Sequence, residues 1–255
     1  MPTLNDKIAW VTGAGSGIGE AAAEALGRAG ATLVLTGRRP EPLERVAARI
    51  EAGGGKALVE PGDLTDSARV GALAASIGER LGRLDILVNN AGVNIRHRSW
   101  AELTPEGIDT ILKGNLSGAF YAVAAALPLM RVQRDGILIH TASWAGRFVS
   151  PVSGPAYTAA KHAVVAMSHT LNMEEFANGI RSTVICPAEV ATPILDLRPQ
   201  PLSAKDRARM LQPADLADLI LYVATRPKHV CLNEILISPI WNRGYLATLP
   251  AGSTP

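Results

Sequence analysis

Short, uninterrupted apolar runs alternate along this chain with longer segments rich in alanine and leucine. In one of them, Ile86, Leu87 and Val88 follow one another with no polar residue between them. A strand with one solvent-facing side would alternate instead, so such runs are typical of strands buried on both faces of a parallel sheet. The pattern therefore predicts an α/β fold, a doubly wound parallel sheet of about seven strands flanked by helices.

The alternation can be followed from one end of the chain to the other. We expect strands at Ile8–Thr12, Thr32–Thr36, Lys56–Glu60, Ile86–Asn89, Gly136–Thr141, Arg181–Cys186 and Glu234–Ser238. We expect helices at Gly17–Ala29, Glu41–Glu51, Asp66–Leu81, Asn115–Arg131, Ala156–Phe176 and Ala214–Ala224. No repeat or linker interrupts this order, so we expect a single domain over residues 1–255, with a loosely ordered tail after Asn242.

Composition and charge exclude several classes of protein. A chain of 255 residues that is 47% hydrophobic is not intrinsically disordered, and a net charge of +2 without a dense basic run argues against nucleic-acid binding. The polar start Met1–Lys7 lacks a signal-peptide core, and the longest apolar stretch, Ala119–Met130, is too short to span a membrane. We therefore expect a cytoplasmic protein with no membrane partner.

Cysteine and histidine spacing gives no sign of a metal site or a disulfide framework. Cys186 and Cys231 lie far apart and outside any CxxC pattern. The helix candidate with His162 and His169 offers no third ligand, so we expect packing or surface roles for the histidines and no metal.

A glycine-rich turn follows the first strand. The sequence TGAGSGIG places Gly13, Gly15, Ser16, Gly17, Ile18 and Gly19 between that strand and an alanine-rich helix. Glycines here let the backbone approach a pyrophosphate, which the positive end of the helix would attract. An ordinary glycine turn is the alternative, but its place in a βαβ unit favours a Rossmann-type dinucleotide site.

The end of the second strand bears on which dinucleotide binds. A NAD site usually has an acidic residue there, whereas this chain has Arg38 and Arg39. The forked guanidinium suits the 2′-phosphate of NADP, although both residues could be solvated loop charges. We expect NADP, with NAD as the alternative; Asp63, after the third strand, could bond the adenine amino group.

Tyr157 and Lys161 lie four positions apart and so share one face of a helix. An ammonium group beside a phenol stabilises the phenolate, so we expect the pKa of Tyr157 to fall toward the working range of a general acid/base. The alternative is a core tyrosine and a surface lysine. Ser143 directly follows the strand Gly136–Thr141, at the same end of the sheet.

In order and spacing, these motifs resemble the short-chain dehydrogenase/reductase family over nearly the whole chain. The matching stretches are TGAGSGIG, Asp63-Leu64, NNAG at Asn89–Gly92, Asn115 in GNLSG, Ser143, and Tyr157 with Lys161. The resemblance implies an NAD(P)-dependent enzyme acting on a CH–OH group, with Asn115, Ser143, Tyr157 and Lys161 as the catalytic set.

The resemblance also implies a role for each residue. Tyr157 would exchange a proton with the substrate oxygen, and Ser143 would hydrogen-bond the same atom. Lys161 would hold the nicotinamide ribose and tune Tyr157, and Asn115 would hold a water that completes a proton relay. The cofactor would be lined by Leu64, Asn90, Ala91 and Gly92, and by backbone groups of Val190 and Thr192.

Two stretches depart from the family pattern. Ala188 stands where Gly often follows Pro187, which puts the local backbone in doubt if that position needs a positive φ. The last strand has the ending Asn233–Pro239 instead of a glycine-rich one, and this resembles NADP-dependent 3-hydroxy acid (serine) dehydrogenases and carbonyl reductases.

Three further segments bear on the substrate. The polar, proline-interrupted stretch Ile194–Arg209 is expected to form a lid, and Trp144, Arg147 and Phe148 either wall the pocket or form a surface loop. Arg96, His97 and Arg98 follow Gly92, and one arginine could grip a carboxylate. This favours a small hydroxy acid, or its keto or semialdehyde form, over the alternative of a neutral ketone, sugar or polyol.

Subunit association is predicted from two helices. Asn115–Arg131 and Ala156–Phe176 carry small or apolar residues on more than one face, so we expect a homo-oligomer, most simply a tetramer. Two other functions remain open: a dinucleotide-binding regulator without activity, and an epimerase or dehydratase that uses the same cofactor.

Overall fold

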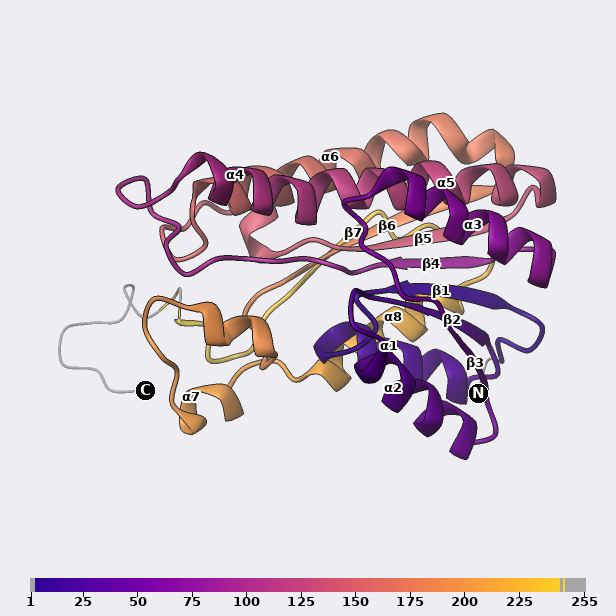
Figure 1. Cartoon of the computed structure of the whole chain (residues 1–255), viewed down its shortest axis with the longest axis horizontal. Coiled ribbons are helices and arrows are strands. Elements are labelled where there is room, and N and C mark those ends of the chain that lie inside the picture. Colours follow the sequence, from indigo (N-terminus) through magenta and orange to yellow (C-terminus); the bar gives the residue numbers. More distant parts are fainter. Residues whose placement is uncertain (1–2, 244, 246–255) are drawn as a thin grey trace.

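A computed structural model describes residues 3–243 and 245, and in that part of the chain seven parallel strands form one sheet (Figure 1). The strand order is β3-β2-β1-β4-β5-β6-β7, and every neighbouring pair is parallel. The strands are β1 (Ile8–Thr12), β2 (Thr32–Thr36), β3 (Lys56–Val59), β4 (Ile86–Asn89), β5 (Gly136–Thr141), β6 (Ile180–Pro187) and β7 (Glu234–Ile237). The predicted fold class is confirmed.

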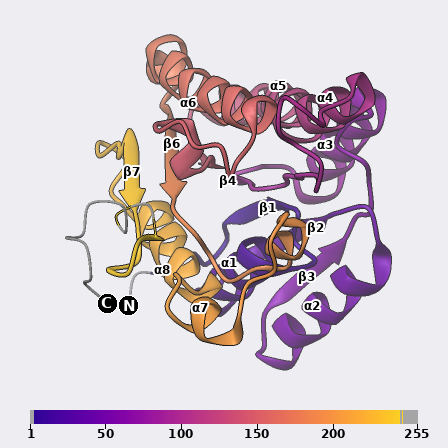
Figure 2. The same ribbon diagram turned by 90° about the vertical axis from the view of Figure 1, so that its left-hand side faces the viewer.

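Helices cover both faces of the sheet (Figure 1). One layer consists of α3 (Ser67–Leu81), α4 (Pro105–Leu112), α5 (Gly118–Gln133) and α6 (Pro155–Glu175). The other consists of α1 (Gly17–Arg28), α2 (Pro40–Ala52) and α8 (Pro213–Ala224). Figure 2 shows these two layers above and below the sheet, and Figure 1 shows that the short helix α7 (Ala204–Ala208) stands apart from both.

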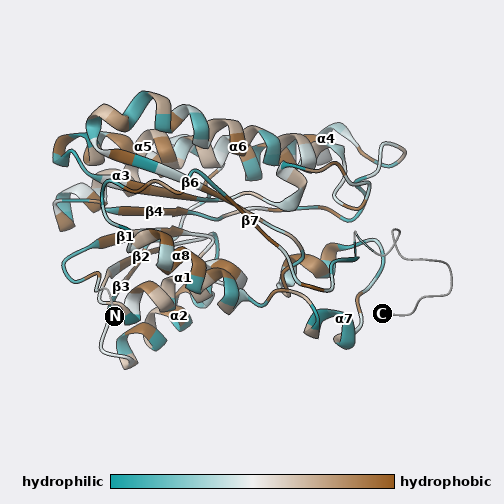
Figure 3. Cartoon of the chain, turned by 180° about the vertical axis from the view of Figure 1, so that it is seen from behind, coloured by the Kyte–Doolittle hydropathy of each residue, from teal (hydrophilic) through white to brown (hydrophobic). Residues whose placement is uncertain are grey.

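Each central strand sends alternate side chains into two separate cores, because successive side chains point to opposite faces. Ala9 and Val11 pack into the core under α1, α2 and α8, whereas Ile8 and Trp10 pack into the core under α3, α5 and α6. All residues of β1, β4 and β5 are buried, which is why these strands are apolar except at their carboxyl ends. Figure 3 shows the largely hydrophobic strands between the helical layers.

The element boundaries differ from the predictions at several places. The helix expected to start at Asn115 begins at Pro105, where Thr104 caps α4 by accepting a hydrogen bond from the Gly107 amide. α4 leads through a π-helical turn, Lys113–Ser117, directly into α5. Short proline-started helices such as α4 carry too few apolar positions for a periodicity to stand out.

The expected lid also contains regular structure. A 3-10 turn at Pro193–Leu197 and helix α7 occupy most of it, and Ser203 and Asp206 form a capping box at the start of α7. The stretch predicted as a loosely ordered tail lies outside the described residues from 246 onward.

The strand order reverses between β1 and β4, whose neighbours β2 and β5 lie on opposite sides. In open α/β sheets, ligands bind beyond the carboxyl ends of the strands at such a reversal. The motifs that follow β1, β4 and β5 therefore meet at one place.

Candidate active site

The glycine-rich turn has the geometry of a phosphate cradle. Gly13 and Gly17 have φ of 64° and 59°, a region that favours glycine. A Cβ at Gly19 would lie 2.3 Å from the carbonyl oxygen of Gly13, so the turn closes tightly only with glycine there. Ser16 stands at the N-cap of α1 without a side-chain cap bond, which leaves the positive helix end open to an anion. These residues fit the pyrophosphate of a dinucleotide.

Thr12 joins this turn to the segment after β4, a role that sequence reasoning did not assign. Its hydroxyl accepts hydrogen bonds from the amides of Asn90 (2.9 Å) and Ala91 (3.1 Å) and donates one to the Val88 carbonyl (3.3 Å). One side chain thus fixes the spacing between the first and fourth strands at the switch point. The signal was its place at the last position of a buried strand, where a polar residue needs partners.

The two arginines after β2 are free to meet a ligand. Arg38 and Arg39 are exposed, and within residues 3–243 and 245 neither side chain has a recorded hydrogen bond or ion pair. Asp63 is also exposed and accepts a hydrogen bond from the Thr65 amide (2.9 Å), while Leu64 is buried. The stretch Thr36–Pro40 around them contains no acidic residue.

Asn115 lies in the π-helical turn and is buried. Its side-chain amide donates to the carbonyls of Ile111 (2.8 Å) and Val93 (2.7 Å), and its oxygen accepts from the Val93 amide (3.2 Å). A Cβ on Gly92 would lie 2.8 Å from the Asn115 oxygen and 3.5 Å from the Lys161 amine. The π turn, a feature often found at functional sites, therefore brings Asn115 and Lys161 to the same glycine.

Lys161 is almost fully buried in α6. Its amine donates to the carbonyl of Thr141 at the end of β5 (2.9 Å) and lies 5.6 Å from the centre of the Tyr157 ring. Among the described residues it has no acidic partner. Burial lowers the pKa of Lys161 to about 8, because the charged form loses its water.

Ser143 accepts a hydrogen bond from the Ala145 amide (3.1 Å), and its side chain lowers the pKa of Tyr157. Burial raises the pKa of Tyr157, and this outweighs the opposing effects of Ser143 and of the positive charges of Arg98 and Arg198. The predicted lowering of this pKa is therefore wrong for the protein without ligands. The reason is that the ammonium of Lys161 is directed at the Thr141 carbonyl while the phenol itself is desolvated.

Two further buried groups lie behind this set. His140 is fully buried on β5, and burial, followed by the charge of Lys161, lowers its pKa to about 3. Its ring stays neutral near pH 7, and its Nδ1 lies 3.4 Å from the Asn89 amide nitrogen. Burial raises the pKa of Cys186 to about 11, so this thiol is not a nucleophile at neutral pH.

Comparison with known proteins agrees with this geometry. Residues 7–201 match the family model described as short chain dehydrogenase. An uncharacterized oxidoreductase of Staphylococcus aureus (strain USA300) is 38% identical over 94% of this chain and 100% of its own length. The chain belongs to the short-chain dehydrogenase family.

Solved structures of related enzymes support the same conclusion. An alcohol dehydrogenase from the archaeon Thermococcus sibiricus, complexed with 5-hydroxy-NADP, has a TM-score of 0.84 at 26% identity and covers 93% of this chain and 98% of its own. A 3-ketoacyl-(acyl-carrier-protein) reductase from Brucella melitensis, complexed with NADH, has a TM-score of 0.83 at 28% identity, over 92% and 98%. This short-chain dehydrogenase is an oxidoreductase that uses a nicotinamide dinucleotide and acts on a CH–OH group.

The segment after β6 closes over the phosphate turn in this short-chain dehydrogenase. A Cβ at Gly17 would lie 2.9 Å from Cγ2 of Thr192, and Thr192 donates from its amide to the Val190 carbonyl (2.8 Å). The backbone at Ala188 does not have the positive φ that would require glycine, since the only described non-glycine residues with positive φ are Asp6 and Arg134. Its amide donates to the Ile237 carbonyl, which continues the β6–β7 pairing.

The structure separates the three cations predicted to attract an anion. His97 is exposed and pairs with Glu102, and Arg96 is exposed and donates to the Asp196 carbonyl (3.2 Å). Arg98 alone is buried, and its charge acts on Tyr157. The other two therefore lie at the surface rather than beside the reacting groups.

The aromatic residues after Ser143 pack on one another. Trp144 and Phe148 have ring centres 4.5 Å apart, and Arg147 pairs with Glu234 of β7 (2.6 Å). No described helix is long and apolar enough to cross a bilayer, and no three His, Cys, Asp or Glu side chains gather in a metal-binding arrangement within the same residues.

Proposed function

We propose that this short-chain dehydrogenase interconverts an alcohol and its carbonyl compound with NADP, and that Asn115, Ser143, Tyr157 and Lys161 form its catalytic set. The observation that carries this is the buried amine of Lys161, 5.6 Å from the centre of the Tyr157 ring, together with the effect of Ser143 on the pKa of that tyrosine. When bound, the nicotinamide supplies or accepts the hydride.

The protein's own residues handle the proton and the developing charge. Because its pKa is raised, Tyr157 is protonated at neutral pH and can donate a proton to a carbonyl oxygen during reduction. Ser143 acts on the pKa of the same phenol, and its hydroxyl can donate to the same substrate oxygen. Lys161 and Asn115 meet at Gly92, where they can position a ribose hydroxyl and a water.

NADP is the proposed cofactor because of the charges at the end of β2. Arg38 and Arg39 are exposed, and the stretch from Thr36 to Pro40 has no carboxylate to repel a 2′-phosphate. The phosphate turn, Asp63, Leu64, the Asn90–Gly92 segment and the backbone of Val190 and Thr192 complete the proposed cofactor site.

The proposed substrate is a small hydroxy acid, or its keto or semialdehyde form, in line with the 3-hydroxy acid dehydrogenase and carbonyl reductase branch. The segment 194–209 is the proposed lid; it contacts the loop after β4 through Arg96 and Arg98, which donate to its backbone carbonyls. A neutral ketone, sugar or polyol is the competing substrate class.

The decisive experiment is a panel of ketones, aldehydes and hydroxy acids, assayed with NADPH or NADP and with NADH or NAD by nicotinamide absorbance. Turnover that consumes the cofactor stoichiometrically supports the proposal. Product formation without net cofactor change would indicate an epimerase or dehydratase. Dinucleotide binding without any turnover would favour a regulator.

A homotetramer in the cytoplasm is the proposed state of the molecule. Phe120 and Tyr121 on α5 and Met173 on α6 are large apolar side chains exposed on neighbouring helices, and a second subunit would cover them. Light scattering at micromolar concentration tests this, and a monomer would refute it.

A further inference from the structure

Arg98 is a buried cation without a carboxylate partner. Its side chain is 5% exposed, and its recorded hydrogen bond runs from Nη2 to the Leu197 carbonyl (3.0 Å). Its Nε is buried and has no partner within residues 3–243 and 245, and no acidic side chain there pairs with it. Burying an uncompensated charge is costly, so such a group is typical of a site that awaits an anion.

The lid contributes a second guanidinium, whose charge acts on Arg98. Arg198 directly follows Leu197, whose carbonyl Arg98 holds, and the positive charges of the two arginines repel each other. Arg198 pairs with Glu189 (2.5 Å), but the same carboxylate also binds Arg243 (2.7 Å). One carboxylate is thus shared by two guanidinium groups, and Arg98 is left with none.

Both arginines act on the reacting group. After Ser143, their charges oppose the effect of burial on the pKa of Tyr157. Arg98 is also held against the start of α6: a Cβ at Gly154, just before that helix, would lie 2.7 Å from the Arg98 carbonyl oxygen and 3.0 Å from its Cβ. The positive charges of both arginines therefore act on the phenol that would meet the substrate oxygen.

We propose that Arg98 and Arg198 together bind the carboxylate of an acidic substrate beside Tyr157, and that the lid residue Arg198 is a specificity determinant. This rests on the proposed hydride transfer at Tyr157 and names the group that selects its substrate. A carboxylate accepts two parallel N–H bonds from a guanidinium, which would give Nε of Arg98 a partner and offset the repulsion between the arginines.

Arg96 shows how an arginine without such a role sits in the same loop. Its side chain is exposed and donates to the carbonyl of Asp196, so water solvates the rest of the guanidinium. Arg98 is two residues further on, yet it is buried, and its charge acts on Tyr157. The difference in burial, not in residue type, singles out Arg98.

The test compares short keto acids with their methyl esters, which differ in charge at one end only. The variants are Arg98→Gln and Arg198→Gln, and the control is Lys56→Gln, which removes an exposed cation at the start of β3 whose side chain has no hydrogen bond or ion pair in the described chain. Each arginine variant should raise KM for the acids about 10- to 100-fold, the loss expected for a bond to a charged group. The KM of these variants for the esters should change by no more than about two-fold. The KM of the control variant should stay within the same limit for both the acids and the esters.

The acid-to-ester ratio separates binding from an effect through Tyr157. Loss of a positive charge also raises the pKa of Tyr157, but this changes kcat for acid and ester alike. Equal losses on both members of a pair, or a wild-type enzyme that prefers the esters, would overturn the proposal while leaving hydride transfer intact.

A binding measurement tests the carboxylate site in variants whose activity is too low for kinetics. Acetate and malonate should raise the Tm of the wild-type protein in the presence of NADP, but not that of Arg98→Gln. This result without turnover of any acid or ester would support the carboxylate site and count against the proposed oxidoreductase function. Equal shifts in both proteins, or none in either, would count against the site.

Discussion

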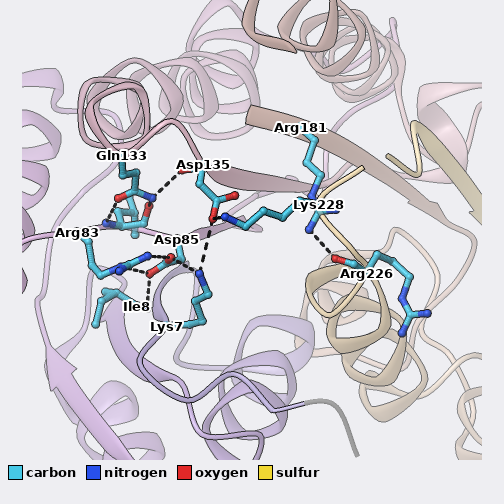
Figure 4. A network of polar contacts seen from close by, with 10 residues as sticks. Lys7, Ile8, Arg83, Asp85, Gln133, Asp135, Arg181, Arg226 and Lys228 are labelled. Atoms are coloured by element: carbon cyan, nitrogen blue, oxygen red, sulfur yellow. Dashed lines mark hydrogen bonds and ion pairs between the residues drawn. The ribbon is translucent and has the colours of Figure 1, made fainter. Parts of the chain in front are cut away.

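Buried charged groups have charged partners at the amino end of the sheet and lack them at the carboxyl end. At the amino end, the carboxylate of Asp85 is 4% exposed and accepts hydrogen bonds from Lys7 (2.8 Å), Arg83 (2.9 and 2.6 Å) and the Ile8 amide (3.0 Å). Asp135 pairs with Lys228 (2.7 Å) and completes the network in Figure 4. Both carboxylate oxygens of Asp85 thus accept hydrogen bonds from the protein itself.

At the carboxyl end, buried cationic and imidazole groups lack some of their hydrogen-bond or charged partners. Lys161 is 4% exposed and has a single carbonyl acceptor, and Arg98 and His140 each keep a buried nitrogen without a partner in the described part of the chain. An unsatisfied buried polar group lowers stability, and such groups collect where a ligand completes them. The comparison assigns stability to one end of the sheet and binding to the other.

The largest effect that tests this division is the replacement Tyr157→Phe. The phenyl ring keeps the packing but cannot exchange a proton, so turnover should fall by about 10²- to 10⁴-fold. Cofactor binding and Tm should stay close to those of the parent. Steady-state kinetics on any substrate of the panel gives the answer, and a loss of only a few-fold would remove Tyr157 from the reaction.

Asp85→Ala is the corresponding change at the amino end. The substitution removes a buried acceptor from Lys7, Arg83 and the Ile8 amide, and should lower the free energy of unfolding by about 2–3 kcal/mol, because both cations can partly reach water. The kcat of the folded fraction should not change. Denaturant titration measures the first quantity, and the assay at low temperature measures the second.

Because the pKa of Asp85 is lowered in the folded protein, we expect its contribution to stability to depend on pH. Burial would raise the pKa of Asp85, but the bonds from Arg83, Lys7 and Ile8 outweigh it and hold the pKa below its usual value. Its stabilising effect is therefore present above the unfolded pKa of about 4 and is lost as the pH falls through the folded pKa. The difference in stability between wild type and Asp85→Ala should shrink in that acid range, whereas a constant difference would contradict the assignment.

These contrasts also show what the sequence could predict. Continuous apolar strands and a glycine-rich turn are local patterns, so the sheet, the cradle and the positions of Ser143, Tyr157 and Lys161 could be inferred. Burial is a tertiary property, so the sequence could not predict the role of Thr12, which of Arg96 and Arg98 is buried, or the direction of the Tyr157 pKa shift. The π turn at Asn115 depends in the same way on contacts with Val93, which is distant in sequence.

Arg38→Ala tests the unpaired charge at the end of β2. A charge-assisted bond to a 2′-phosphate is worth about 1.5–3 kcal/mol, so the affinity for NADPH should fall about 10- to 150-fold while that for NADH barely changes. Fluorescence titration with both cofactors measures this. A parent protein that already binds NADH more tightly than NADPH would contradict the role of Arg38.

Lys161→Met should give the smallest change in stability, and its sign is opposite to that of Asp85→Ala. Burial lowers the pKa of Lys161 to about 8, so below that pH the folded protein bears the cost of a desolvated charge, about 3 kcal/mol before the bond to Thr141 is counted. Between about pH 8 and 10.5 the unfolded chain binds more protons than the folded one, so this cost disappears as the pH rises. The methionine variant should therefore be as stable as the wild type at pH 7, or up to about 2 kcal/mol more stable, and should lose that advantage near pH 10.

Thermal unfolding at the two pH values measures this difference. A variant that is less stable than the wild type at pH 7 would show that Lys161 holds the fold together, and that the carboxyl end is not built for binding alone.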